Sequence, residues 1–386
     1  MISPAYFKNI PNIFNFSVHL SNNGMCNSNS ITIVTVSPLE GYCNSTLQFT
    51  ISGTQIRTPE VSLLHLNPYK HLMVRVSSGD LPEGFQMVDF SLTSSITLLG
   101  HGANFATAGS TIRRQNETIF QSGISPFSLD VQIVHFHRFQ SRTEELYRQA
   151  DLTLHVSVKN KLPRPREFSK SLYTIDIGQT DLAVGFRQMS NMQLRTAIAD
   201  IINQFSAAVT RLYQQGARAF WIHNTGPIGC LPVSTLYLRN PKQGVLDNYG
   251  CLKRHNELAL EFNRQLKARI RTLRAELEHA AITYVDVYAA KYELISNAKS
   301  QDFMEPQKIC CGLHEGNRHV WCGQKGIVRG AEVFGGACVN PSDYISWDGI
   351  HYSQAANQWI ANHILNGNFS DPPIPITHAC HKHLHY

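Results

Sequence analysis

Residues 194–223 read LRTAIADIINQFSAAVTRLYQQGARAFWIH, and this stretch decides the fold class. From Leu194 to Leu212 the apolar residues recur at helical spacing, and Gly216 follows as a cap, which predicts an amphipathic helix. The next run, Ala219 to His223, is short and apolar and is followed by turn residues, which predicts a buried strand. A helix followed at once by a buried strand is typical of α/β proteins.

The same alternation continues on both sides of this stretch. Ser171 to Ile177 reads as a second buried strand, Asn256 to Glu278 as a second amphipathic helix, and Ile282 to Val287 as a third strand. We therefore expect a mostly parallel sheet covered by helices, with functional groups at the carboxyl ends of its strands. Ser17 to Gly100 lacks this pattern, because it is rich in serine, asparagine and threonine with only short apolar runs.

Composition narrows the class of protein. The chain has 386 residues, of which 42% are hydrophobic and 16% charged, as in ordinary globular proteins. The net charge is +6, but the basic residues are scattered, which argues against a nucleic-acid-binding surface. No run of eighteen apolar residues occurs, so we expect no membrane-spanning segment.

Sequons and cysteines point to an oxidising compartment. Asn44, Asn116 and Asn368 each begin an N-glycosylation sequon, and five of the nine cysteines lie between Cys310 and Cys380. An odd cysteine count leaves at least one thiol unpaired. Prolines and a lysine interrupt the first sixteen residues, so no signal peptide is read there. The expectation is a secreted lineage whose start has been lost.

Trp347-Asp-Gly-Ile-His-Tyr352 places a carboxylate three residues before an imidazole. At this spacing Asp348 can accept a hydrogen bond from one ring nitrogen of His351 and fix its tautomer, which leaves His351 to act as a general base. Taken alone, an Asp-x-x-His pair is more often a salt link at the start of a helix.

Several further blocks make the pair specific. They are HGANFATAGST at 101–111, DIGQTD at 176–181, FWIHNTGPIGCLP at 220–232, CCG at 310–312 and AAN at 355–357. Together these blocks resemble the plant GDSL esterase/lipase family of the SGNH hydrolase superfamily, and they are most similar to its subgroup of early-nodulin-like proteins and α-fucosidases. The resemblance implies a three-layer α/β hydrolase domain over residues 101–386, whereas residues 1–100 form an atypical segment that matches only at 13–16.

The resemblance assigns most of a catalytic site but no nucleophile. It implies that Asp348 and His351 are catalytic and that Gly109 and residue 180 form the oxyanion hole, where Thr180 replaces the asparagine of the family. Ile13 to Phe16 match the residues that lead into the family's Gly-Asp-Ser block, but His19 stands where the nucleophile belongs and no Gly-Asp-Ser occurs anywhere. Loss of the nucleophile costs on the order of a millionfold in rate, and loss of one oxyanion donor roughly a hundred- to a thousandfold.

The resulting expectation is an esterase/lipase that hydrolyses carboxylic esters by a Ser-His-Asp type mechanism, impaired by the missing serine block. Its substrate would be a small ester, a lipid or an acylated glycan, with no cofactor and no nucleic acid. Two alternatives remain open. One is an inactive member that still binds a ligand. The other is an aberrant gene model, in which Ser17 to Gly100 is a mis-spliced or frame-shifted stretch.

Other cysteines and histidines invite competing interpretations. Cys311-x-x-His314 and His319-x-x-Cys322 have a spacing that could bind zinc, but disulfides are favoured and we expect no metal. Cys230 and Cys251 are expected to bridge to each other, and His223 to be a hydrogen-bonded core histidine. A run of histidines near the C-terminus is expected to be a solvated tail: His378, His381, His383 and His385.

Overall fold

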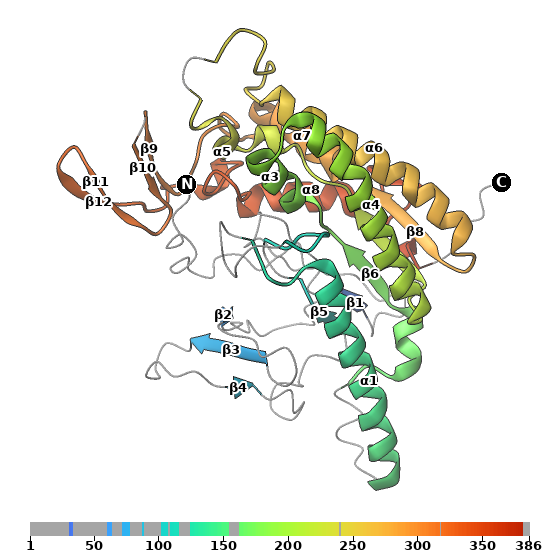
Figure 1. Cartoon of the computed structure of the whole chain (residues 1–386). Coiled ribbons are helices and arrows are strands. Elements are labelled where there is room, and N and C mark those ends of the chain that lie inside the picture. Colours follow the sequence, from blue (N-terminus) through green and yellow to red (C-terminus); the bar gives the residue numbers. More distant parts are fainter. Residues whose placement is uncertain are drawn as a thin grey trace.

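The structure is a computed structural model that describes residues 31–33, 60–63, 72–77, 87–88, 102–106, 109–115, 124–153, 162–238, 241–316 and 318–380. Its central sheet has the strand order β13-β8-β7-β6 (Figure 1). The strands β6 (Leu172–Ile175), β7 (Ala219–His223) and β8 (Ala281–Val285) are parallel, and β13 (Ser370–Asp371) pairs with β8 in the antiparallel sense. The three predicted strands are thus confirmed.

Helices alternate with these strands as the sequence predicts. The predicted helices are α4 (Asn191–Gln214) and α6 (Lys253–Glu276), which lie side by side (Figure 1). Additional helices are α1 (Leu129–Thr153), α3 (Gln179–Gln188), α5 (Pro232–Thr235), α7 (Val287–Ser296) and α8 (Gln354–Leu365). The helix α4 also packs against α1 and α3, and α7 packs against α8. The chain therefore has the expected α/β fold with helical layers around a mostly parallel sheet.

The apolar stripe of α4 explains how the helix is held on the core. Its six apolar positions are all buried: Leu194, Ile198, Ile201, Phe205, Val209 and Leu212. The strand β7 is buried along its whole length, and Phe220 and Trp221 are completely excluded from solvent. Because each fully buried large apolar side chain contributes on the order of 2 kcal/mol, this stripe and strand supply much of the folding energy.

The N-terminal segment contributes short strands where it is described. The strand β1 (Ile31–Ile33) pairs in parallel with β5 (Gly102–Asn104), and β1 also contacts β6 at the edge of the central sheet. A separate antiparallel sheet joins β2 (Glu60–Leu63), β3 (Leu72–Ser77) and β4 (Met87–Val88). It lies apart from the central sheet in Figure 1. The predicted domain boundary at residues 100–101 stays a prediction.

Two hairpins follow the last parallel strand. They join β9 (Gly312–Glu315) to β10 (Arg318–Trp321), and β11 (Lys325–Val328) to β12 (Ala331–Phe334), and they appear in orange-brown in Figure 1. Disulfides join Cys310 to Cys338, and Cys311 to Cys322, at the base of these hairpins. The alternative of a four-ligand zinc site is therefore wrong, because both cysteine ligands are consumed by one disulfide.

The predicted disulfide between Cys230 and Cys251 is present, and Cys380 is also disulfide-bonded. None of the helices in the described ranges is long and apolar enough to cross a membrane.

Candidate active site

The Asp348–His351 pair lies on a tight loop between the 3₁₀ turn η7 (Pro341–Asp343) and α8. Two backbone hydrogen bonds close the loop, from Trp347 N to His351 O at 2.8 Å and from Ser353 N to Ile345 O at 2.8 Å. The neck of the loop is therefore held like a short hairpin, which fixes the two side chains at its tip.

The carboxylate and the imidazole form a buried hydrogen-bonded pair, as the sequence predicts. Nδ1 of His351 lies 2.5 Å from Oδ2 of Asp348, and the two residues are 4% and 0% exposed. The other carboxylate oxygen accepts hydrogen bonds from the backbone N–H groups of Ile350 and His351, at 3.0 and 2.8 Å.

Electrostatics keep this carboxylate ionised. Burial by itself raises the pKa of Asp348, but the His351 imidazole and the two backbone N–H donors outweigh it and hold that pKa below its ordinary value. An ionised Asp348 accepts the proton on Nδ1 of His351, so Nε2 is the nitrogen that can act as a base.

The second half of the site is the beginning of α3, at the carboxyl end of β6. Gly178 makes the turn between them with φ at +116°, and a Cβ at this position would lie 2.4 Å from Cζ of Phe262. Only glycine fits this conformation and this close approach. Thr180 follows in the first turn of α3, where it is 1% exposed and its Oγ1 has no hydrogen-bond partner among the described residues.

Asp181 ties this helix to the loop that carries Gly109. Its two carboxylate oxygens accept hydrogen bonds from the backbone N–H groups of Ile112 at 2.8 Å and Arg113 at 3.1 Å. Gly109 is itself buried, and its carbonyl accepts a hydrogen bond from Ser125 N at 2.9 Å. The two predicted oxyanion-hole residues therefore belong to two segments that the buried carboxyl group of Asp181 holds together. No local sequence pattern predicts this role of Asp181.

Lys291, on α7, lies near both halves of the site. Its Nζ lies 4.7 Å from the ring centroid of Tyr352, the neighbour of His351. The same Nζ and Oε1 of Gln179, the neighbour of Thr180, both border Gly226. A Cβ built on Gly226 would lie 3.4 Å from the Nζ and 3.7 Å from the Oε1. The structure thus brings the predicted residues of α3 and of the Asp348 loop to one region, with a buried lysine between them.

His223 is not a competing base. Trp221 Nε1 donates to Nε2 of His223 at 3.1 Å, so Nδ1 carries the proton and donates to Asp176 Oδ2, also at 3.1 Å. Both ring nitrogens have partners, which confirms the prediction of a hydrogen-bonded core histidine.

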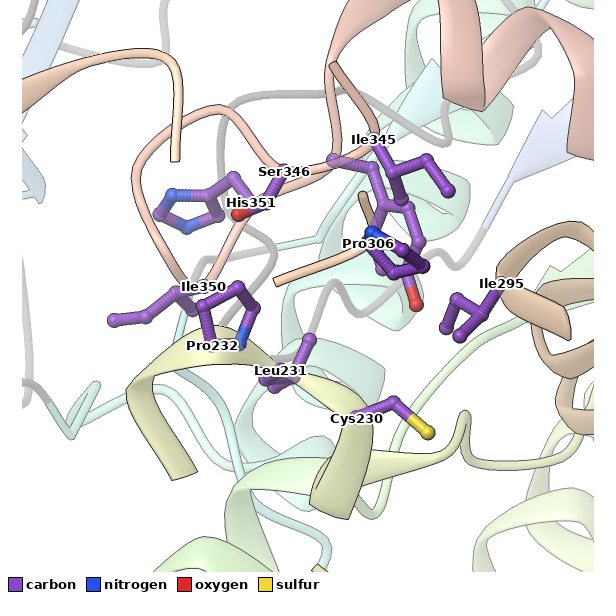
Figure 2. A pocket seen from close by; sticks show the side chains of 10 residues that line it. Cys230, Leu231, Pro232, Ile295, Pro306, Ile345, Ser346, Ile350 and His351 are labelled. Carbon is purple, nitrogen blue, oxygen red and sulfur yellow. The ribbon is translucent and has the colours of Figure 1, made fainter. Parts of the chain in front are cut away.

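A small pocket opens beside His351 and encloses about 220 Å³ out to the open solvent. Figure 2 shows His351 on one side of it, with Ile295 and Pro306 on the other. The lining is mostly apolar: Cys230, Leu231, Pro232, Ile295, Pro306, Ile345, Ser346, Ile350, His351 and Tyr352.

The structure describes some of the remaining predicted residues and not others. Asn368 is exposed and lies just before β13, and His378 is exposed near the end of the described chain. Several residues singled out by the sequence lie outside the described residues: Ile13 to Phe16, His19, Asn44, Asn116, His381, His383 and His385. The nucleophile position therefore lies outside them too.

Comparison with known proteins places the chain among plant hydrolases. The family model described as GDSL-like lipase/acylhydrolase matches residues 74–364. The GDSL esterase/lipase At5g14450 of Arabidopsis thaliana is 57% identical over 282 residues, which cover 73% of this chain and 72% of that protein. Alpha-L-fucosidase 3 of Arabidopsis thaliana is 46% identical, with 69% and 72% covered. The GDSL esterase/lipase ENOD8 of Medicago truncatula is 38% identical, with 82% and 84% covered.

Proposed function

The chain belongs to the GDSL-like lipase/acylhydrolase family, and from this premise we propose that it is an ester hydrolase in which His351 is the general base and Asp348 orients it. The observation that carries the proposal is the 2.5 Å contact between His351 Nδ1 and an ionised, fully buried Asp348. Such a pair leaves Nε2 to remove a proton from a hydroxyl nucleophile and to return it to the leaving alcohol.

Gly109 and Thr180 are proposed to stabilise the negative oxygen of the tetrahedral intermediate. In support, Asp181 holds their two segments together, and Thr180 Oγ1 is buried without a partner among the described residues. A donor that needs no rearrangement to meet the developing charge contributes most to catalysis. Lys291 adds a buried positive charge between this region and Tyr352.

Turnover is proposed to be slow, because His19 occupies the sequence position of the family's serine and no Gly-Asp-Ser is present. The nearest hydroxyls, Ser17 and Ser21, are two positions away. An error of even about 1 Å in the position of an attacking atom can cost on the order of a hundredfold in rate.

Hydrolysis of a short-chain p-nitrophenyl ester by the full chain tests this function. Activity should disappear in His351→Ala and persist in His378→Ala, which removes an exposed histidine instead of a buried one. A fluorophosphonate probe should label the chain only if a serine attacks. Ester hydrolysis that survives His351→Ala would contradict the assigned base.

A second candidate is a non-catalytic member that binds an ester or glycan without turnover, and the absent serine block favours it. Binding of an ester analogue without hydrolysis would support this candidate. Sequencing the transcript across the codons for Phe16 and Gly100 addresses the third possibility, since an uninterrupted reading frame, confirmed by peptides, would exclude a splicing or frame-shift artefact.

For the natural substrate we propose a small ester, a lipid or an acylated glycan, in a secreted setting. Relatives called lipase, esterase and fucosidase support this range of substrates, and the disulfides support an oxidising compartment. Asn368 is exposed and is the described sequon that a glycan could reach. Mass spectrometry of the protein from a plant secretory host should find a glycan there, and an unmodified Asn368 would contradict the proposal.

A further inference from the structure

Two histidines face each other across the hairpin of β9 and β10. His314 and His319 are direct partners in the antiparallel register, and their Nδ1 atoms are 3.4 Å apart. The Cys311–Cys322 disulfide closes the open end of the same hairpin, so the two imidazoles project from a braced support.

The separation of the two nitrogens fits metal coordination better than a hydrogen bond. Two imidazole nitrogens bound to one tetrahedral ion at about 2.0–2.1 Å are roughly 3.4 Å apart. Hydrogen bonds donated by N–H groups are usually about 2.7–3.2 Å long. We propose that His314 and His319 form a site for a divalent zinc or copper ion, bound through the two Nδ1 atoms.

The protonation of the pair suits a metal. Burial lowers the pKa of both imidazoles, and for His314 the neighbouring His319 lowers it further, while the Asp348 carboxylate acts in the opposite direction. Neutral imidazoles have the lone pairs that zinc and copper bind. A hydrogen bond with the Cys311 backbone also acts against the lowering of the His314 pKa.

The site is open and coupled to the Asp348 loop. Two protein ligands leave the other positions of the ion to water, and both histidines are only partly buried, so an ion can enter from solvent. Backbone N–H groups of Cys310 and Cys311 donate to Ser346 O at 3.1 Å and Trp347 O at 2.6 Å, directly before Asp348. An ion that clips β9 to β10 therefore stiffens the segment that supports the catalytic pair.

Titration of the full chain with Zn²⁺ and with Cu²⁺ tests the site. The background variant carries His381→Ala, His383→Ala and His385→Ala, because these histidines near the C-terminus would bind the same ions. Calorimetry should find one bound ion. Cu²⁺ should quench tryptophan emission, since the ring centroids of His314 and Trp321 are 5.2 Å apart.

His314→Ala and His319→Ala should each weaken binding at least about tenfold, whereas the exposed control His378→Ala should leave it unchanged. His319 is less enclosed than His314, so His319→Ala keeps the test valid if His314→Ala fails to fold. Absence of stoichiometric binding at about 100 μM metal, or binding that both variants retain, would show that the pair is only hydrogen-bonded. None of these measurements depends on ester hydrolysis.

Discussion

Replacing Asp181 with asparagine should change how the stability of the protein depends on pH. Burial raises the pKa of Asp181 from 3.8 to about 7, although two backbone N–H donors favour the ionised carboxylate. Between these two pH values the folded state holds a proton that the unfolded state has released. The stability that this group contributes is therefore fully present below about pH 3.8 and is lost as the pH rises towards about 7.

The size of the effect follows from the shift. Each pKa unit is worth about 1.36 kcal/mol, so the free energy of unfolding of the wild-type protein should fall by about 2.6 kcal/mol between about pH 5 and about pH 8 on account of Asp181 alone. The asparagine variant lacks this change. Near pH 5 its free energy of unfolding should instead lie about 1–3 kcal/mol below that of the wild type, because one acceptor oxygen becomes an NH₂ group that faces a backbone donor. This deficit should shrink as the pH rises towards about 8, because only the wild type loses stability over that range.

Urea unfolding of both proteins at a series of pH values measures the difference. Asp200→Asn is the matched control, because it removes the same charge at an exposed position 3.7 Å from Arg113. Burial lowers the pKa of His255 to about 4, which acts in the opposite direction, but His255 is present in all three proteins and cancels. If the free energy of unfolding depends on pH in the same way in the wild type and in Asp181→Asn, the two N–H donors keep Asp181 ionised and burial does not raise its pKa.

Three further predictions concern the support of the site. Gly178→Ala should cost roughly 1–3 kcal/mol more than Gly216→Ala in urea unfolding, because both have positive φ but only the first would meet a phenyl ring at 2.4 Å; equal costs would contradict this steric account. Removing the Cys230–Cys251 bridge, which spans 21 residues, should lower the free energy of unfolding by about 3 kcal/mol, and an unchanged melting temperature would contradict it. Thr180→Asn should raise kcat up to about a hundredfold with little change in KM, and an unchanged kcat would remove Thr180 from the oxyanion hole.

The sequence predicted the secondary structure well where packing follows a regular period. The apolar stripe predicted where α4 lies in the sequence. The helix nevertheless begins at Asn191 and not at Leu194, because Ser190 and Gln193 form a capping box one turn before the first buried residue. A hydrophobic period marks where burial starts, whereas the cap decides where the helix starts. The Asp348–His351 pair was also predictable, because its geometry is local.

Contacts between distant segments were beyond the sequence. Asp181 bonds to Ile112, which is 69 residues away, and Lys291 approaches Tyr352 from another helix. No spacing encodes such pairs. The zinc alternative failed for a related reason, since a Cys-x-x-His and His-x-x-Cys spacing is also what a hairpin closed by one disulfide produces.

Unsatisfied polar groups indicate where a ligand would bind, whatever supplies the nucleophile. Gln179 Nε2 and Thr180 Oγ1 at the start of α3, and Thr225 Oγ1 just after β7, are buried without hydrogen-bond partners in the described part of the chain. Each such group costs about 1–3 kcal/mol, and together they lie where the carboxyl ends of adjacent parallel strands meet, the usual binding edge of an α/β sheet. A ligand oxygen that accepts from these donors would recover part of that cost. The hydrolase and the ligand-binding alternative therefore share one binding place and differ only in whether a hydroxyl reaches Nε2 of His351.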